Sequence, residues 1–177
     1  MDGLWVNLLV ILVLILVGGC FVAAELAIVS LRDSQVARLA EEGGRRGRRL
    51  KSLFAYPNRF LAAGQIGVTL TGFLSAAFGE SQISPAIVPI LVGWGVGELL
   101  AEILVLIVVT SVIAYFSLVL GELVPKRLAL QRTERIAMIS AGPLDAIASF
   151  LRPVIVLLSA STDFIVRLFG VDPKAKR

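Results

Sequence analysis

Three long uncharged apolar stretches constrain this chain more than any other feature. They run over residues 4–24, 60–79 and 103–121, and each has about the 17 to 25 residues that an α-helix needs to cross a bilayer. The chain is 57% apolar with a mean hydropathy of +0.89, which is more than soluble domains usually carry. The sequence therefore predicts an all-α integral membrane protein with three transmembrane helices. We place these spans at about residues 4–31, 60–79 and 99–122.

The placement of basic residues predicts how these spans are oriented. All lysines and arginines lie at residues 32–59 or from Lys126 onward. Because cytoplasmic loops carry the excess of basic residues, we expect the N-terminus outside, the C-terminus inside and an acidic outer loop at residues 80–102. The first stretch begins without lysine or arginine and is longer than the core of a signal peptide, so we expect it to stay in the mature protein.

Two further segments, at about residues 32–55 and 128–170, predict short amphipathic helices at the cytoplasmic interface. The first mixes apolar side chains such as Val36 and Leu53 with many arginines, as in helices that lie on a membrane surface. We expect its basic residues to face lipid head groups rather than a specific ligand such as a nucleotide phosphate, because it has no Gly-rich phosphate loop. These basic residues are Arg45, Arg46, Arg48, Arg49 and Lys51.

The second interfacial segment has apolar runs interrupted by charges and prolines, and none is long enough to cross a bilayer. Leucines and isoleucines recur there at helical spacing, which predicts two helices broken at Pro153. A fourth crossing is the alternative. The sequence Asp-Pro-Lys-Ala-Lys-Arg at residues 172–177 resembles a linker cut short, so we expect a cytoplasmic domain after residue 177.

Composition excludes several classes of site. Histidine is absent and Cys20 is the single cysteine, so we expect no disulfide, no zinc cluster and no histidine-activated nucleophile, and hence no enzyme. The sequence pI is about 9.7, yet the basic residues follow membrane topology without interleaved aromatic residues. We therefore expect no nucleic-acid partner. The predicted organisation is one membrane domain over residues 1–177.

Two glutamates, Glu25 and Glu122, lie at the inner ends of predicted spans. A charge at membrane depth costs about 2.5 to 3.5 kcal/mol on insertion scales, so such residues usually face a polar cavity and mark an ion path. For Glu25 the alternative, that it only reaches the interface, is equally plausible. Glu122 is followed by Pro125, which lacks the N–H that would bond to the Gly121 carbonyl in a continuing helix. A carboxylate beside a free carbonyl suits a hard cation such as Mg²⁺ or Na⁺, and we favour this interpretation over a simple helix stop.

The second span carries two polar lines at helical spacing. Gln65 and Thr69 form one line, in which the amide can offer an oxygen to a cation or, equally, form an interhelical hydrogen bond. The other line is a small-residue stripe that permits close helix packing; its members are Ala63, Gly67, Thr71 and Ser75. We therefore predict a polar pocket open to the cytoplasm, with a cation held by Glu122, Gly121, Gln65, Thr69 and Glu25.

Five ordered motifs resemble the transmembrane domain of the CNNM/CorC (cyclin M, hemolysin-C-like) family. They are Phe-Val-Ala-Ala-Glu-Leu-Ala at 21–27, Leu-Ala-Glu-Glu-Gly at 39–43, Pro-Asn-Arg-Phe-Leu-Ala at 57–62, Gln-Ile-Gly-Val-Thr-Leu at 65–70 and Gly-Glu-Leu-Val-Pro-Lys at 121–126. The resemblance implies a homodimer in a bacterial plasma membrane that transports Mg²⁺, usually outward and driven by Na⁺. It also implies a belt of short helices, followed by CBS-pair and CorC-type cytoplasmic domains that bind ATP outside this chain.

The chain departs from the family pattern at two places. Where many members have Ser-x-Ser-Glu, it has Val22, Ala23 and Ala24 before Glu25, and Val68 stands in the place of an asparagine. The sequence is thus similar to a Gln-x-Gly-x-Thr branch in which some members resemble polyamine exporters. Three hypotheses follow: a Mg²⁺ transporter, an exporter of polyamines or other cations, and a membrane anchor that dimerises without transport.

Overall fold

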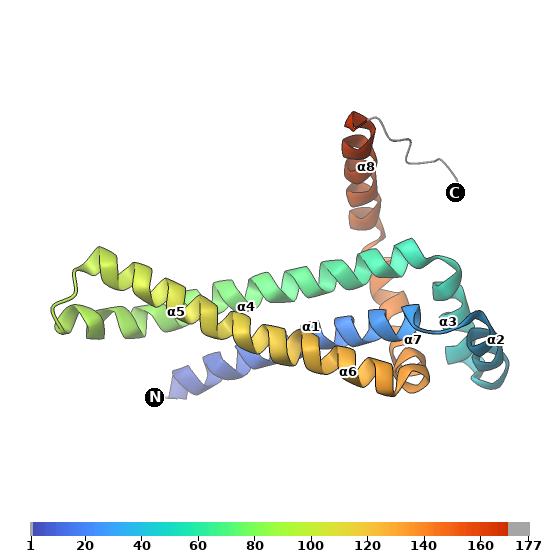
Figure 1. Ribbon diagram of the computed structural model, residues 1–177, viewed down its shortest axis with the longest axis horizontal. Helices are drawn as coiled ribbons and strands as arrows, with labels where there is room; N and C mark the ends of the chain where they lie inside the picture. Colours follow the sequence, from blue (N-terminus) through green and yellow to red (C-terminus); the bar gives the residue numbers. More distant parts are fainter. Residues whose placement is uncertain (1, 170–177) are drawn as a thin grey trace.

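Three long helices form the body of the molecule (Figure 1). The computed structural model describes residues 2–169, which contain helices and no strand. The long helices are α1 (Asp2–Val29), α4 (Pro57–Gly93) and α5 (Glu98–Leu118), and α5 continues through the π-helix η1 (Val119–Leu123) into α6 (Val124–Gln131). All three are long and apolar enough to cross a membrane. The predicted all-α fold with three spans is confirmed.

The outward faces of these helices carry the surface that a bilayer requires. A soluble protein rarely exposes a contiguous apolar patch of this extent, whereas lipid tails accept it. The exposed side chains include Leu9, Val13 and Leu16 on α1, Leu70, Phe73 and Leu74 on α4, and Ile103, Ile107 and Val108 on α5.

We call the two ends of the bundle inner and outer after their predicted orientation. The outer end differs from the sequence prediction, because residues 80–93 are helical rather than part of a loop. Helix α4 has 37 residues with Pro85 and Pro89 inside it, so it is roughly 55 Å long, well beyond the roughly 30 Å of bilayer hydrocarbon. A short turn follows, in which Gly95 has a φ of +90°, and α5 begins at Glu98. Figure 1 shows this α4–α5 hairpin extending past the start of α1.

At the inner end, short helices close the bundle. They are α2 (Asp33–Glu42), α3 (Gly44–Ala55), α7 (Thr133–Phe150) and α8 (Arg152–Leu168). Helices α7 and α8 meet at 71°, and α8 points across the direction of the long helices (Figure 1). The break lies at Leu151, because Pro153 fits only in the first turn of α8. The bent pair also meets the length and composition criteria of one broken span, which would make four.

Two apolar clusters hold the structure together. The inner cluster joins α1, α3, α4 and α7 through side chains such as Ile28, Leu50, Phe60 and Leu144. The outer cluster is smaller and joins α1 to α5. Val36 and Leu53 are buried in the inner cluster, so the apolar faces of α2 and α3 pack on protein rather than entering the membrane surface as their sequence pattern indicated.

The far end of the chain lies outside the described residues. Residues 170–177 include Lys174, Lys176 and Arg177, which we used for orientation. The inside location of the C-terminus and the domain expected after residue 177 therefore stay predictions.

Candidate functional site

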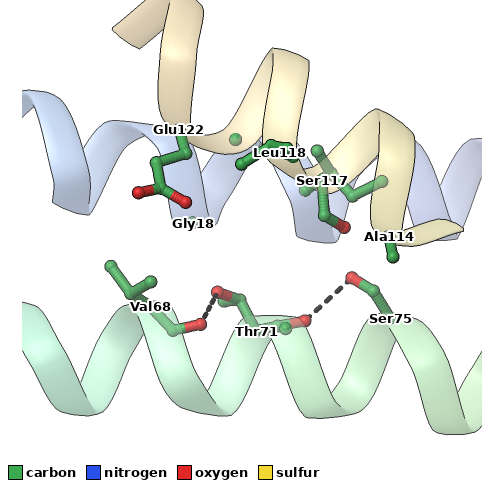
Figure 2. Close-up of a pocket in the computed structure, with 11 residues that line it drawn as sticks. Gly18, Val68, Thr71, Ser75, Ala114, Ser117, Leu118 and Glu122 are labelled. Atoms are coloured by element: carbon green, nitrogen blue, oxygen red, sulfur yellow. Dashed lines mark hydrogen bonds between the residues drawn. The ribbon is translucent and has the colours of Figure 1, made fainter. Parts of the chain in front are cut away.

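A cavity of about 430 Å³ lies between the two apolar clusters, where α1, α4, α5 and η1 approach one another. Figure 2 shows the Glu122 side chain pointing from η1 across this space toward α4. The lining residues are Ile15, Gly18, Val68, Thr71, Gly72, Ser75, Ala114, Ser117, Leu118, Gly121 and Glu122.

The polar part of the lining consists of oxygen atoms. The hydroxyl of Thr71 donates to the carbonyl oxygen of Gly67 at 2.7 Å, and the hydroxyl of Ser75 donates to the carbonyl oxygen of Thr71 at 2.8 Å. Each hydroxyl uses its proton on the backbone and keeps oxygen lone pairs that can accept or coordinate. With Ser117 and the Glu122 carboxylate, the cavity offers oxygen ligands from two sides.

The backbone beside Glu122 is a π-helix rather than a helix end. The N–H of Val124 donates to the carbonyl oxygen of Val119, five residues earlier, and Leu123 and Val124 keep helical backbone angles. The helix therefore continues past Pro125, and the helix break predicted at this position is a π-turn. Single π-turns occur frequently at functional sites.

Close packing on α1 fixes this π-turn. A Cβ atom added at Gly19 would lie 2.8 Å from Pro125 Cγ and 3.1 Å from the Leu120 carbonyl oxygen. One added at Gly121 would lie 3.3 Å from the Ile15 carbonyl oxygen. The contact at Gly19 leaves no room for a side chain and the contact at Gly121 is tight, so glycine on each helix lets α1 and η1 approach closely.

Lys126 forms an ion pair with Glu122. Its Nζ atom donates to Glu122 Oε1 at 2.6 Å, and both side chains are about half exposed. Lys126 is also close enough to Glu25 for their opposite charges to attract. Glu25 packs against Gly64 of α4, where an added Cβ atom would lie 2.9 Å from Glu25 Oε2. Glu25 does not line the cavity; it lies about two helical turns further in along α1 than Gly18.

The structure brings together only part of the predicted pocket. Gly121 and Glu122 line the cavity, but Gln65 and Thr69 are exposed on another face of α4. There the Gln65 amide donates to the Thr69 hydroxyl at 3.3 Å. The polar side chains of α4 that do line the cavity, Thr71 and Ser75, belong to the stripe that we interpreted as packing residues.

A signal for these missed residues was present in the sequence. Thr71 and Ser75 are one turn apart, and the stripe that contains them has only small side chains, so a neighbouring helix must pass close to it. A hydroxyl on such a face is brought near the neighbouring helix, whereas Gln65 and Thr69 lie outside this stripe. The third hydroxyl, Ser117, precedes Glu122 by five residues and gave no independent signal.

Within residues 2–169, no three histidine, cysteine, aspartate or glutamate side chains converge as a metal-binding group. A cation in the cavity would therefore meet one carboxylate, neutral oxygens and retained water. This is an arrangement for a cation that stays hydrated in part, as Mg²⁺ commonly does.

The predicted basic belt lies on α3, away from the cavity. Its five side chains, Arg45, Arg46, Arg48, Arg49 and Lys51, are exposed. Arg49 also approaches α7, where a Cβ atom added at Gly142 would lie 3.2 Å from its Nη1 atom. These charges are therefore available to an anionic surface.

Comparisons with known proteins agree with this architecture. The family described as "Cyclin M transmembrane N-terminal domain" matches residues 9–177. The UPF0053 protein sll0260 of Synechocystis is 38% identical to this chain, and the match covers 95% of this chain and 38% of the relative. The UPF0053 protein YrkA of Bacillus subtilis is 33% identical, and the match covers 97% of this chain and 39% of the relative. An uncharacterized protein of Mycobacterium tuberculosis, Rv1841c, is 34% identical, and the match covers 93% of this chain and 47% of the relative. The chain thus spans less than half the length of these relatives.

Proposed function

Because this chain belongs to the cyclin M transmembrane-domain (CNNM) family of multi-pass membrane proteins, we propose that it transports Mg²⁺ across a bacterial plasma membrane. The proposed direction is outward, from a cavity open to the cytoplasm, with inward Na⁺ as the driving ion. The transporting unit is a homodimer, and the cytoplasmic CBS-pair and CorC-type domains that the resemblance implies would follow this chain.

One observation carries the proposal: the Glu122 carboxylate and the hydroxyls of Thr71, Ser75 and Ser117 line one cavity between membrane-spanning helices. An ionisable side chain at membrane depth is costly and usually serves an ion pathway. Carboxylate, hydroxyl and carbonyl oxygens are the ligands that Mg²⁺ and Na⁺ prefer, and Mg²⁺ usually keeps several of its waters. The cavity volume of about 430 Å³ leaves room for such waters.

The polar face of α4 supports the homodimer. Gln65 and Thr69 are exposed at membrane depth and bond only to each other among the described residues. A side-chain amide that faces lipid leaves hydrogen-bonding capacity unused, whereas a second copy of the chain can supply partners. In this arrangement Gln65 and Thr69 act between the subunits, and the cation contacts Glu122, Thr71, Ser75 and Ser117.

The basic belt supports attachment to the inner leaflet. Five exposed basic side chains on α3 lie at the end of the molecule that the positive-inside rule places in the cytoplasm. Clusters of this size next to a span attract anionic lipid. The belt would hold the inner end of the bundle at the membrane surface.

The test is Mg²⁺ flux from liposomes containing the reconstituted chain, with the variant Glu122→Gln. We expect the parent to move Mg²⁺ in the direction opposite to an imposed Na⁺ gradient and Glu122→Gln to lose at least about 90% of that rate, since the amide carries no charge. Glu41→Gln, on the exposed face of α2, is the matched control and should behave as the parent. Flux by Glu122→Gln at the parent rate would refute the site, and absence of any flux from the parent would favour a membrane anchor.

One feature favours a second candidate substrate, an organic polycation such as a polyamine. Glu122 and Glu25 are spread along the inner half of the bundle instead of converging on one point, as an elongated molecule with two ammonium groups requires. Calorimetry of the purified chain with Mg²⁺, Na⁺ and putrescine separates the candidates. If putrescine gives a heat of binding and Mg²⁺ and Na⁺ do not, the substrate is a polyamine rather than Mg²⁺.

A further inference from the structure

Lys126 places a positive charge inside a site that we propose for cations. Its ammonium group donates to Glu122 Oε1 at 2.6 Å and also attracts Glu25 on α1. The three groups lie on separate elements, because Glu122 belongs to η1, Lys126 to α6 and Glu25 to α1. No lysine or arginine lies within the three predicted spans, and Lys126 is the first basic residue after the third span.

A bound cation and this ion pair exclude each other. The ammonium already uses one oxygen of the carboxylate that would meet Mg²⁺, and its charge repels a second cation nearby. Next to apolar walls that repulsion is screened much less than in bulk water. An incoming cation therefore has to displace Lys126 from Glu122.

A second acceptor is available to the displaced ammonium. Glu25 lies about two turns further in on α1 than the cavity, packed against Gly64, and it is near enough to Lys126 for their opposite charges to attract. The flexible lysine side chain can shift toward Glu25 without leaving its charge unpaired. Glu122 and Glu25 thus offer two alternative partners to one ammonium.

We propose that Lys126 is a tethered counter-cation that neutralises Glu122 in the ion-free site and moves to Glu25 when a cation binds. The inference rests on the proposed function, since it requires Glu122 to bind the cation. Lys126 lowers the affinity of the site and speeds release of the ion, because the ammonium competes for the same oxygen. Glu25 raises the affinity indirectly by holding Lys126 away.

The experiment measures Mg²⁺ affinity by calorimetry on the purified chain, together with flux from liposomes. Removing the competitor in Lys126→Gln should tighten Mg²⁺ binding about tenfold, which lies within the usual range of coupling between two sites, and slow the flux. The matched control is Arg127→Gln, which removes the same charge from an exposed neighbouring position and should leave affinity and flux unchanged. Lys126→Arg keeps a cation and should remain within about threefold of the parent on the same scale.

A double-mutant cycle separates this role of Glu25 from direct ligation. Glu25→Gln should weaken Mg²⁺ binding severalfold in the parent, since Lys126 then stays on Glu122, and should have no effect in the Lys126→Gln background. If Glu25→Gln weakens binding equally in both backgrounds, Glu25 is a direct ligand and the inference is wrong.

The remaining outcomes also decide the question. A gain in affinity cannot result from misfolding, so Lys126→Gln reports on competition and not on stability. Binding in Lys126→Gln that equals or falls below that of Arg127→Gln would overturn the inference while leaving the proposed function intact, provided that Glu122→Gln abolishes binding. If Glu122→Gln binds Mg²⁺ as the parent does, the proposed function itself fails.

Discussion

Proline lies in a membrane helix near a glutamate in two regions of this molecule, with different results. At Glu122 and Pro125 the helix forms a π-turn that packs against Gly19 of α1 and opens onto an oxygen-lined cavity. In the outer part of α4, Pro85 and Pro89 follow Glu80, yet that helix stays α-helical and packs against α5. Proline alone therefore does not create a site.

The difference lies in the neighbouring helix. At the π-turn, glycines on α1 and η1 allow contact near 3 Å between the two helices, which holds the irregular backbone against protein. In the outer hairpin, a Cβ atom added at Gly93 would meet nothing within 4 Å. Irregular backbone at membrane depth persists where it is buried in protein or lines a cavity, and only the first region meets that condition.

The largest effect should come from filling the contact beneath the π-turn. In Gly19→Ala the added methyl group would lie 2.8 Å from Pro125 Cγ, so α1 and η1 must separate. We expect the free energy of unfolding to fall by about 1 to 3 kcal/mol, and a shift of about 1 Å at Glu122 to lower the Mg²⁺ flux on the order of a hundredfold. Thermal melting and liposome flux measure the two effects. Gly93→Ala, in the outer hairpin, is the control, and equal losses in both variants would refute the comparison.

Restoring the missing N–H should have the next largest effect. Pro125→Ala supplies an N–H donor that favours a regular α-helical hydrogen bond to the Gly121 carbonyl. The π-turn is then less favoured, and a change to α-helical bonding would rotate Glu122 relative to α6. We expect Mg²⁺ flux to fall about tenfold with little change in the yield of folded protein. The control, Pro85→Ala, should keep the parent rate because α4 has no π-turn to lose. Parent-like flux from Pro125→Ala would show that the π-turn does not depend on the proline.

A smaller effect should distinguish two threonines of α4. Thr71→Val removes a hydroxyl that lines the cavity, and we expect the Mg²⁺ flux to fall about fivefold, equivalent to about 1 kcal/mol for one neutral oxygen contact. Thr69→Val removes an exposed hydroxyl two residues away, which we place between the subunits and not at the cation, so the flux should fall less than in Thr71→Val. If Thr69→Val lowers the Mg²⁺ flux more than Thr71→Val does, Thr69 is a cation ligand, as the sequence predicted.

These regions also show what the sequence could predict. Charge-free length alone was sufficient for the three helices, because a bilayer demands it, and Glu122 with Pro125 correctly marked irregular backbone. Thr71 lines the cavity and Thr69 does not, and the sequence of α4 alone could not show this because the face that a helix turns toward its neighbours depends also on the glycines of those neighbours. The outer loop was predicted because the uncharged stretch ends before Glu80, but a helix that extends out of the membrane tolerates this charge and the two prolines that follow it.

The smallest effect is expected at the outer carboxylates, and it tests whether the comparison holds for the whole length of the bundle. Glu80 and Glu102 line a hollow between α4 and α5 near Pro85 and Pro89, and Ser84 donates to Glu80 Oε1 at 2.6 Å. The double variant Glu80→Gln, Glu102→Gln keeps the size of both side chains, and an amide oxygen can still accept from Ser84. We therefore expect flux within about twofold of the parent, because neither side chain lines the cavity at Glu122. A tenfold loss in the same liposome assay would mean that ions pause at the outer hairpin on their way out, and that the π-turn is one of two sites along the path.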